Sequence, residues 1–187
     1  MKYLILAITG LPGSGKTEVT RCIENQNFAR VRFGDVTDNE LRKQNLPRTE
    51  KNERVVREEL RKKHGMAVYA LLSLPKIRTA ARKGNVVLDG LYSWEEYKLL
   101  RKQFPGMILT AVHAPPRLRY ARLIHRPERP LTEQEVRSRE ESELEVLNKG
   151  GTIAMADYII ENLGTKKALI EKTRRLIHAL LKTKQKE

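Results

Sequence analysis

The stretch "ITGLPGSGKTEV", Ile8 to Val19, continues from the apolar run "YLILAI" and decides the fold. Residues 10–17 fit the pattern G-x-x-x-x-G-K-[ST], with an apolar strand pattern before them and the helical pattern "KTEVTRCIE" after them. Glycines let backbone N–H groups turn inward around an anion, and the following helix adds the positive end of its dipole. We therefore predict that this loop holds the phosphates of a nucleotide.

Within this loop the side chains have distinct predicted roles. Lys16 would reach the β- and γ-phosphates, and the hydroxyl of Thr17 would ligate the Mg²⁺ that bridges them. The predicted nucleotide-binding residues are Gly10, Leu11, Pro12, Gly13, Ser14, Gly15, Lys16, Thr17 and Glu18.

The loop alone names a ligand and not a reaction, because switches, motors and kinases all use it. A guanine-nucleotide switch needs an Asn-Lys-x-Asp motif to read the base, and the Asn148-Lys149 pair is followed by two glycines instead. A chain of 187 residues also leaves little room for the extra lid domain of a motor or an oligomeric ATPase. These two observations favour a kinase.

Composition predicts one soluble globular domain over residues 1–187, with 40% hydrophobic and 32% charged residues. No apolar stretch approaches the roughly 18–20 residues of a membrane span or completes a signal peptide. We therefore expect a cytoplasmic protein. Cys22 is the single cysteine, which excludes an internal disulfide and a cysteine metal cluster. The net charge of +14 fits a polyanionic partner, an anionic small substrate or a merely basic surface.

Apolar runs alternate with helical patterns along the chain, which predicts an α/β three-layer domain with a parallel sheet and right-handed crossovers. The runs expected to form buried strands are 3–9, 29–34, 85–90, 106–114 and 156–162.

Two segments look like additions to this sheet. Residues 35–84 are longer than one crossover helix requires, and "HRPERPLT", residues 125–132, is a loop rich in proline and arginine. Within the first segment, Thr49 is a candidate N-cap and Gly65 a helix stop, whereas Pro75 predicts a kink or a break. Both segments are candidates for moving parts, with an ordinary helical insertion and an ordinary charged loop as the alternatives.

Two carboxylates follow predicted strands at the edge of the sheet where open α/β folds bind ligands. Asp89 could hold Mg²⁺ through water or orient an acceptor hydroxyl; as a helix cap it is less suited than Ser93. Asp35 could hydrogen-bond the attacking group or accept its proton, and it could equally be a turn aspartate.

Four arginines, Arg119, Arg122, Arg126 and Arg129, are spaced by three or four residues, so that several share one helix face running into the 125–132 loop. A planar and permanently charged guanidinium suits a transferring phosphoryl group. This pattern predicts an arginine-rich lid, with a solvated charge run as the alternative.

Together these motifs resemble the P-loop nucleotide kinases of the adenylate kinase and dephospho-CoA kinase superfamily. The chain is most similar to a largely archaeal family of dephospho-CoA-kinase-like and adenylate-kinase-related proteins, over residues 4–165. The segments that carry the resemblance are "GLPGSGKT", "GDVTDNEL", "NLPRTEKN", "LRKKHG", "LDGLYSWEE", "HAPPRLRYARL" and "AMADYIIENLG".

The resemblance implies a P-loop NTPase fold with a five-stranded parallel sheet, a helical acceptor-binding insertion at about 35–84 and a short lid at about 122–135. It implies that ATP and Mg²⁺ are the cofactors. The implied catalytic residues are Lys16, Asp35, Asp89, Arg122, Arg126 and Arg129. Thr17 and Asp89 would hold the metal, and Arg122, Asn162 and Gly164 would lie near the nucleotide. Two arginines of the family pattern are Asp38 and Tyr92 here, and Arg42 is a candidate substitute for the first.

The sequence therefore predicts ATP- and Mg²⁺-dependent phosphoryl transfer to a small anionic acceptor such as dephospho-CoA or a nucleoside monophosphate. The alternative is a nucleotide-dependent nucleic-acid-binding protein or a kinase of polynucleotide 5′ ends. Aromatic residues are only 5% of the chain and are not interleaved with the basic ones, which disfavours a base-stacking surface. We expect a small-molecule partner, no membrane association, and a monomer or a homodimer.

Overall fold

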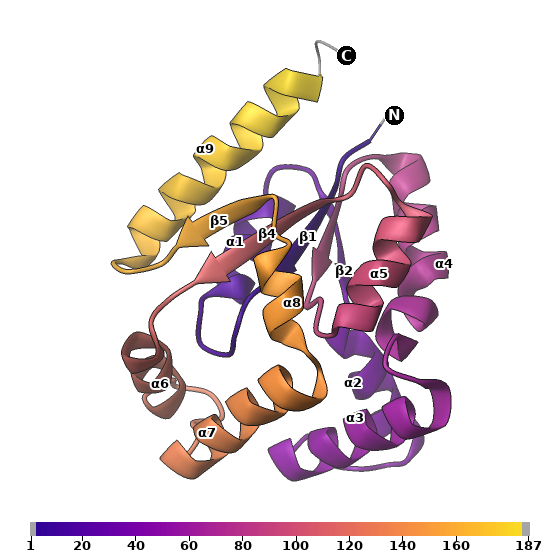
Figure 1. Cartoon of the computed structure of the whole chain (residues 1–187), viewed down its shortest axis with the longest axis vertical. Helices are drawn as coiled ribbons and strands as arrows, with labels where there is room; N and C mark the ends of the chain where they lie inside the picture. The colour runs from indigo at the N-terminus through magenta and orange to yellow at the C-terminus, as the bar shows by residue number, and fades with distance from the viewer. Residues whose placement is uncertain (1–2, 185–187) are drawn as a thin grey trace.

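A five-stranded parallel sheet lies at the centre of the computed structural model, which describes residues 3–184 (Figure 1). The strands are β1 (Ile5–Thr9), β2 (Ala29–Arg32), β3 (Val86–Asp89), β4 (Ile108–His113) and β5 (Tyr158–Glu161). Their order in the sheet is β2-β3-β1-β4-β5, and every neighbouring pair is parallel. Each of the five predicted runs contains one strand, so the predicted α/β fold with a five-stranded parallel sheet is confirmed.

Helices cover both faces of the sheet. Their bounds are α1 (Lys16–Glu24), α2 (Gly34–Lys43), α3 (Glu50–His64), α4 (Val68–Lys83), α5 (Trp94–Gln103), α6 (Pro116–Ile124), α7 (Glu133–Glu141), α8 (Lys149–Ala154) and α9 (Lys166–Lys184), with a π-helical turn η1 (Ser142–Val146) after α7. Within residues 3–184, every helix is too short or too polar to span a bilayer.

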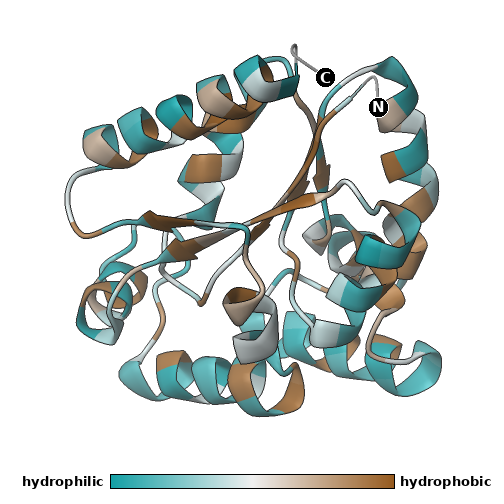
Figure 2. Ribbon diagram, turned by 45° about the horizontal axis from the view of Figure 1, so that its top comes forward, coloured by the Kyte–Doolittle hydropathy of each residue, from teal (hydrophilic) through white to brown (hydrophobic). Residues whose placement is uncertain are grey.

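The core is divided by the sheet into two apolar layers, because successive side chains of a strand point to opposite faces. On one face Ile5 and Ala7 pack with α4 and α5, and on the other Leu6 and Ile8 pack with α1 and α9. Figure 2 shows the strands in brown between helices whose outer faces are teal. This burial on both faces explains why the strand runs read as continuously apolar.

The predicted insertion between the second and third strands is helical and consists of α2, α3 and α4. The hydroxyl of Thr49 accepts a hydrogen bond from the Asn52 N–H at 3.2 Å, and α3 ends before Gly65 at φ +84°, as predicted. Pro75, however, lies inside an unbroken α4, so the predicted break is wrong. Pro75 has no N–H to donate to the Leu71 carbonyl, and Leu71 lies on the exposed side of α4.

A second helical segment follows β4 and passes over the carboxyl ends of the strands. The predicted loop 125–132 joins α6 to α7 and has a small apolar cluster of its own, formed by Leu123, Leu131 and Val136. In Figure 1, α7 and α3 lie beside each other beyond the end of the sheet opposite to the chain termini. We call residues 116–154, from α6 to α8, the lid segment.

Candidate active site

We call the loop after β1, residues 10–17, the phosphate loop. It lies where the order of the strands reverses, because the chain adds strands on both sides of β1. Strands β3 and β2 stand on one side of β1, and β4 and β5 stand on the other. Open α/β sheets bind their ligands at this kind of switch point, beyond the carboxyl ends of the strands.

Glycines are required in this loop by both conformation and space. Gly13 has φ +76°, and a Cβ there would lie 2.5 Å from the carbonyl oxygen of Arg119 in α6. Gly10 has φ +140°, and its Cβ would lie 2.3 Å from the carbonyl oxygen of Val112 in β4. The loop is therefore packed against the elements on either side, as an anion-binding loop must be to hold its shape.

Lys16 lies folded over this loop. Its ammonium donates hydrogen bonds to the carbonyl oxygens of Gly10 at 2.7 Å and Leu11 at 2.9 Å. Burial, together with the nearby positive charge of Lys149, lowers the pKa of Lys16 to about 7. A phosphate beside the ammonium would favour its charged form, so the loop and the lysine fit an anion.

Thr17 and Asp89 are the two predicted metal ligands. Thr17 is exposed and lines the main cavity, and Asp89 is paired in the sheet with Ile8, two residues before the phosphate loop. Arg30 donates from Nε to Asp89 Oδ2 at 3.0 Å, whereas Oδ1 has no hydrogen-bond donor among the described residues. A hydroxyl and a carboxylate oxygen are suitable donors for Mg²⁺, which usually takes its other ligands from phosphates and water.

Asp35 follows the second strand, as the sequence predicts, but it does not line the cavity. The second strand ends at Arg32 and α2 begins at Gly34, so helical spacing aims Gly34, Thr37 and Asp38 into the cavity and turns Asp35 away.

The carboxylate of Asp35 is instead held by two cations. It accepts hydrogen bonds from Lys76 at 2.9 Å and Arg32 at 3.2 Å. Burial would raise the pKa of Asp35, but the bonds and charges of Lys76 and Arg32 lower it. Asp38 therefore replaces Asp35 as the acidic residue of α2 that faces the cavity. Arg42, the candidate substitute, is exposed and bonds Asn39.

The main cavity has a volume of about 520 Å³ and reaches from the phosphate loop to α3 and the lid segment. Its lining is dominated by charge. The arginines are Arg32, Arg48, Arg54, Arg57, Arg61, Arg126, Arg129 and Arg139, and the acidic residues are Asp38, Glu50, Glu53, Glu58, Glu135 and Glu143. Eight cations against six anions leave this cavity positive, which suits an anionic ligand.

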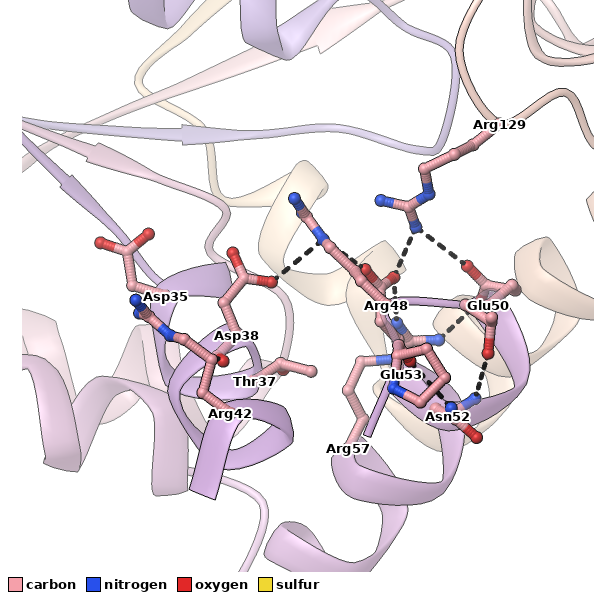
Figure 3. Close-up of polar contacts among 12 residues, drawn as sticks. Asp35, Thr37, Asp38, Arg42, Arg48, Glu50, Asn52, Glu53, Arg57 and Arg129 are labelled. Carbon is pink, nitrogen blue, oxygen red and sulfur yellow. Dashed lines mark hydrogen bonds and ion pairs between the residues drawn. The ribbon is translucent and has the colours of Figure 1, made fainter. Parts of the chain in front are cut away.

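Glu53 organises the α3 side of the cavity (Figure 3). It accepts hydrogen bonds from Arg48 at 2.9 Å and from Arg129, in the lid segment, at 2.7 Å, and Arg57 lies at 3.5 Å. Burial would raise the pKa of Glu53, but these arginines lower it. Arg48 also contacts Asp38 at 3.2 Å, so one network ties α2, α3 and the lid segment together.

The predicted lid arginines separate into two groups. Arg126 and Arg129 line the cavity, whereas Arg122 lies on the other side of the phosphate loop, 3.1 Å from the carbonyl oxygen of Asn162. Arg119 is buried, bonds Glu140 and reaches the carbonyl of Pro12 at 3.4 Å. Of the four arginines, Arg119 and Arg122 lie on α6, which ends at Ile124, and Arg126 and Arg129 stand in the loop that follows.

The remaining predicted nucleotide residues lie at the rear of the loop. Asn162 donates from its side-chain amide to the Ser14 carbonyl at 2.8 Å, so it supports the loop directly. Gly164 is exposed, and a Cβ there would meet open space. Glu18 pairs with Lys166 at 2.6 Å, toward the start of α9, and does not line the cavity.

Sequence reasoning missed three residues of the lid segment, Arg139, Glu143 and Lys149. Arg139 and Glu143 line the cavity, and Lys149 is fully buried behind Glu143 at 2.5 Å. In the sequence, Lys149 serves only to exclude a guanine-nucleotide switch, and no spacing rule links it to Lys16, 133 residues earlier in the chain. The π-helical turn that holds Glu143 is a signal visible only in the structure.

Comparisons with known proteins agree with this architecture. A family profile described as "AAA domain" matches residues 6–148. A UPF0200 protein from Thermococcus gammatolerans is 35% identical over 184 residues, covering 96% of each chain. A UPF0200 protein from Sulfurisphaera tokodaii is 33% identical over 181 residues, covering 95% of this chain and 97% of its own.

Solved structures with the same fold are more distant in sequence. The structure of TT1252 from Thermus thermophilus has a TM-score of 0.63 at 19% identity and covers 98% of both chains. A shikimate kinase from Bacteroides thetaiotaomicron has a TM-score of 0.59 at 16% identity and covers 96% of this chain and 98% of its own. A dephospho-CoA kinase from Campylobacter jejuni has a TM-score of 0.59 at 13% identity with the same coverage. These similarities confirm the predicted P-loop kinase-like fold.

Proposed function

We propose that this chain, which belongs to the AAA domain family and to the UPF0200 family, is a kinase that transfers the γ-phosphoryl group of ATP to a small anionic acceptor. The observation that carries the proposal is the positive cavity that begins at Thr17 of the phosphate loop and ends among the arginines of α3 and the lid segment. Such a cavity puts a donor site and an acceptor site side by side, as phosphoryl transfer requires.

Two buried donor groups support an anionic acceptor. Arg61 Nε and Arg126 Nη2 are buried and have no hydrogen-bond partner among the described residues, and both side chains line the cavity. A buried donor without a partner destabilises the free protein, so a ligand that accepts hydrogen bonds from these groups would gain binding free energy. Burial and the neighbouring arginines Arg139 and Arg129 lower the pKa of Arg126, which an anion would reverse.

The cavity also limits the size of the acceptor. Its volume of about 520 Å³ falls in the range of small-molecule pockets, and the Arg61 guanidinium lies over the Tyr69 ring at 4.8 Å from the centroid. The acceptor class is therefore a phosphate- or carboxylate-bearing metabolite, such as dephospho-CoA or a nucleoside monophosphate. A polynucleotide 5′ end is the alternative acceptor.

The mechanism consists of positioning and charge neutralisation. The loop amides and Lys16 bind the donor phosphates, and Asn162 keeps the loop in shape through Ser14. Mg²⁺, held by Thr17 and Asp89, would offset the charge of the phosphates. Asp38 orients the acceptor from α2, and Arg126 of the lid segment stabilises the transferring group.

Three placements follow as part of the same proposal. Arg122 and Gly164 would lie on the base side of the nucleotide, since Arg122 bonds Asn162 behind the phosphate loop. The enzyme would act as one domain over residues 1–187. It would work in the cytoplasm, where the Cys22 thiol stays reduced.

The experiment is a binding and turnover screen with purified protein. Calorimetric titration with ATP and Mg²⁺ should show binding that Lys16→Ala abolishes and that Lys102→Ala, an exposed lysine of α5, leaves unchanged. ADP release is then measured with dephospho-CoA, each nucleoside monophosphate and a 5′-hydroxyl oligonucleotide. Accelerated release with one small acceptor supports the proposal. A wild-type protein that binds no ATP, or that releases ADP only with the oligonucleotide, refutes it.

A further inference from the structure

Lys149 is a fully buried lysine at the first position of α8. Its ammonium lies 2.5 Å from Glu143 Oε2 and 4.8 Å from the centroid of the Tyr92 ring. A buried charge is costly unless it is paired, so a lysine in this position needs a reason. The roles proposed above for the phosphate loop and the arginines do not use it.

The surrounding structure fixes the lysine firmly. Asn148, directly before it, is in the left-handed conformation at φ +48°, and the Trp94 N–H of α5 donates to the Leu147 carbonyl at 3.1 Å. A Cβ on Gly151 would meet the Trp94 ring at 3.4 Å, so α8 packs closely on α5. The chain therefore holds Lys149 at this point instead of letting it reach solvent.

The local charge is out of balance. Among the described residues, Glu143 is the one carboxylate that pairs with Lys149, and Lys16 pairs with none. Burial would raise the pKa of Glu143, but the charges of Lys149 and Lys16 lower it to about 2. Arg139 adds a third positive charge at Glu143, and Asp89 is the second carboxylate that acts on Lys16, so three cations stand against two carboxylates. A further negative charge beside the two lysines would therefore be favourable.

The pair also lies close to both Lys16 and the cavity. Glu143 and Tyr92 line the same cavity as Thr17, and Lys149 stands directly behind both of them. Arg139, at 3.7 Å from Glu143, borders the pair on the cavity side and has a second partner in Glu50 at 3.3 Å.

We propose that Lys149 is a second phosphate-binding lysine and that Glu143 is its counter-ion until nucleotide binds. The terminal phosphate of the triphosphate then replaces the Glu143 carboxylate as the partner of the ammonium, as it replaces the Gly10 and Leu11 carbonyls at Lys16. This inference rests on the proposed function. It adds Lys149 of α8 to the catalytic residues, and it makes Glu143 a competitor of the terminal phosphate for the Lys149 ammonium.

Two substitutions test the inference because they should act in opposite directions on ATP binding. Lys149→Met removes a charge-assisted contact to the terminal phosphate, so the Kd for ATP should rise about ten- to a hundredfold while the Kd for ADP changes less than about threefold. Glu143→Gln removes the competitor and leaves the lysine unpaired, so ATP should bind several times more tightly although the free protein melts at a lower temperature.

A purely structural ion pair predicts a different pattern. In that case both substitutions lower the melting temperature, and both weaken or leave unchanged the binding of ATP and ADP alike. The ATP-to-ADP ratio of Kd values, measured by calorimetry, is therefore the deciding quantity. If Lys149→Met does not fold, Glu143→Gln decides alone, because tighter ATP binding is expected only from the exchange of partners.

The matched control is the exposed ion pair Arg137–Glu133 of α7, at 2.7 Å, whose members do not line the cavity. Arg137→Met and Glu133→Gln should leave both Kd values unchanged. An unchanged ATP-to-ADP ratio in Lys149→Met, or weaker or unchanged ATP binding in Glu143→Gln, overturns the inference and leaves the proposed function standing. Wild-type protein that binds no ATP overturns the proposed function itself.

Discussion

Replacing Glu53 by Gln removes the charge at the centre of the network on α3 while keeping the side-chain shape. The carboxylate is 9% exposed and lies within 3.5 Å of three arginines, Arg48, Arg57 and Arg129, whose exposed fractions run from 24% to 49%. After the substitution these cations still converge, but without their shared anion. Stability should therefore fall through loss of attraction and through repulsion among the arginines.

The loss of stability in Glu53→Gln should lie between the values for a buried and an exposed ion pair. Breaking a fully buried ion pair costs about 3–5 kcal/mol, and an exposed pair contributes about 0–1 kcal/mol. The carboxylate is buried and its partners are partly exposed, so we expect a loss of about 2 kcal/mol. For a chain of 187 residues, this corresponds to a fall in Tm of about 4–8 °C.

The contribution of the Glu53 carboxylate to stability should depend on pH. The pKa of Glu53 is lowered in the folded protein, so its contribution is complete above the ordinary glutamate pKa of 4.5 and is lost as the pH falls through the folded value. The difference in Tm between the wild type and Glu53→Gln, measured by calorimetry, should be full at pH 7 and should shrink below pH 4.5.

The same helix offers a control. Glu58 pairs with Arg54 at 2.9 Å, and both side chains are more than half exposed, so Glu58→Gln should change stability by less than about 1 kcal/mol. Equal melting of Glu53→Gln and the wild type at pH 7 would refute the reasoning. So would a difference that stays the same size at pH 3.5.

Three other perturbations have defined outcomes. Gly13→Ala puts a Cβ on a residue at φ +76° and 2.5 Å from the Arg119 carbonyl oxygen. It should lower the free energy of unfolding, measured in urea, by at least about 1–3 kcal/mol and abolish ATP binding. A Kd for ATP like that of the wild type would contradict this prediction. Asn162→Ala loses the buried bond to the Ser14 carbonyl, so it should cost about 1–3 kcal/mol of stability and raise the Kd for ATP about tenfold. An equal Kd would show that the bond does not support the loop. The pKa of Lys16 is lowered to about 7, so the protein should take up a proton when it binds ATP at pH 8, and its affinity for ATP should fall as the pH rises above 7. Calorimetry in buffers of different ionisation enthalpy measures the proton uptake. Binding without proton uptake would contradict this prediction.

Local sequence was sufficient for features that depend on neighbours along the chain. The glycine-rich turn between β1 and α1, the Thr49 cap of α3 and the Ser93 cap of α5 were all predicted correctly, because their conformations are set within four or five residues. The five strands were also predicted, since burial on both faces leaves a continuous apolar run.

Features that depend on where an element ends were predicted less well. The second strand stops at Arg32, two residues before the predicted end, and this one difference exchanges Asp35 for Asp38 as the residue that faces the cavity. In the same way, α6 ends before Arg126, which separates Arg122 from the other lid arginines. Sequence patterns do not fix such boundaries, because tertiary pairing decides them.

The sequence by itself determined that this protein has a parallel α/β sheet with a glycine-rich loop between β1 and α1, because hydrophobic periodicity and a contiguous glycine motif are local properties. The charged cavity was decided only by tertiary structure, because it unites α2, α3 and the lid segment through ion pairs between residues up to 89 positions apart. The Glu143–Lys149 pair shows the same limit. Its two members are six residues apart, but only the packing of α8 on α5 buries the lysine beside Tyr92.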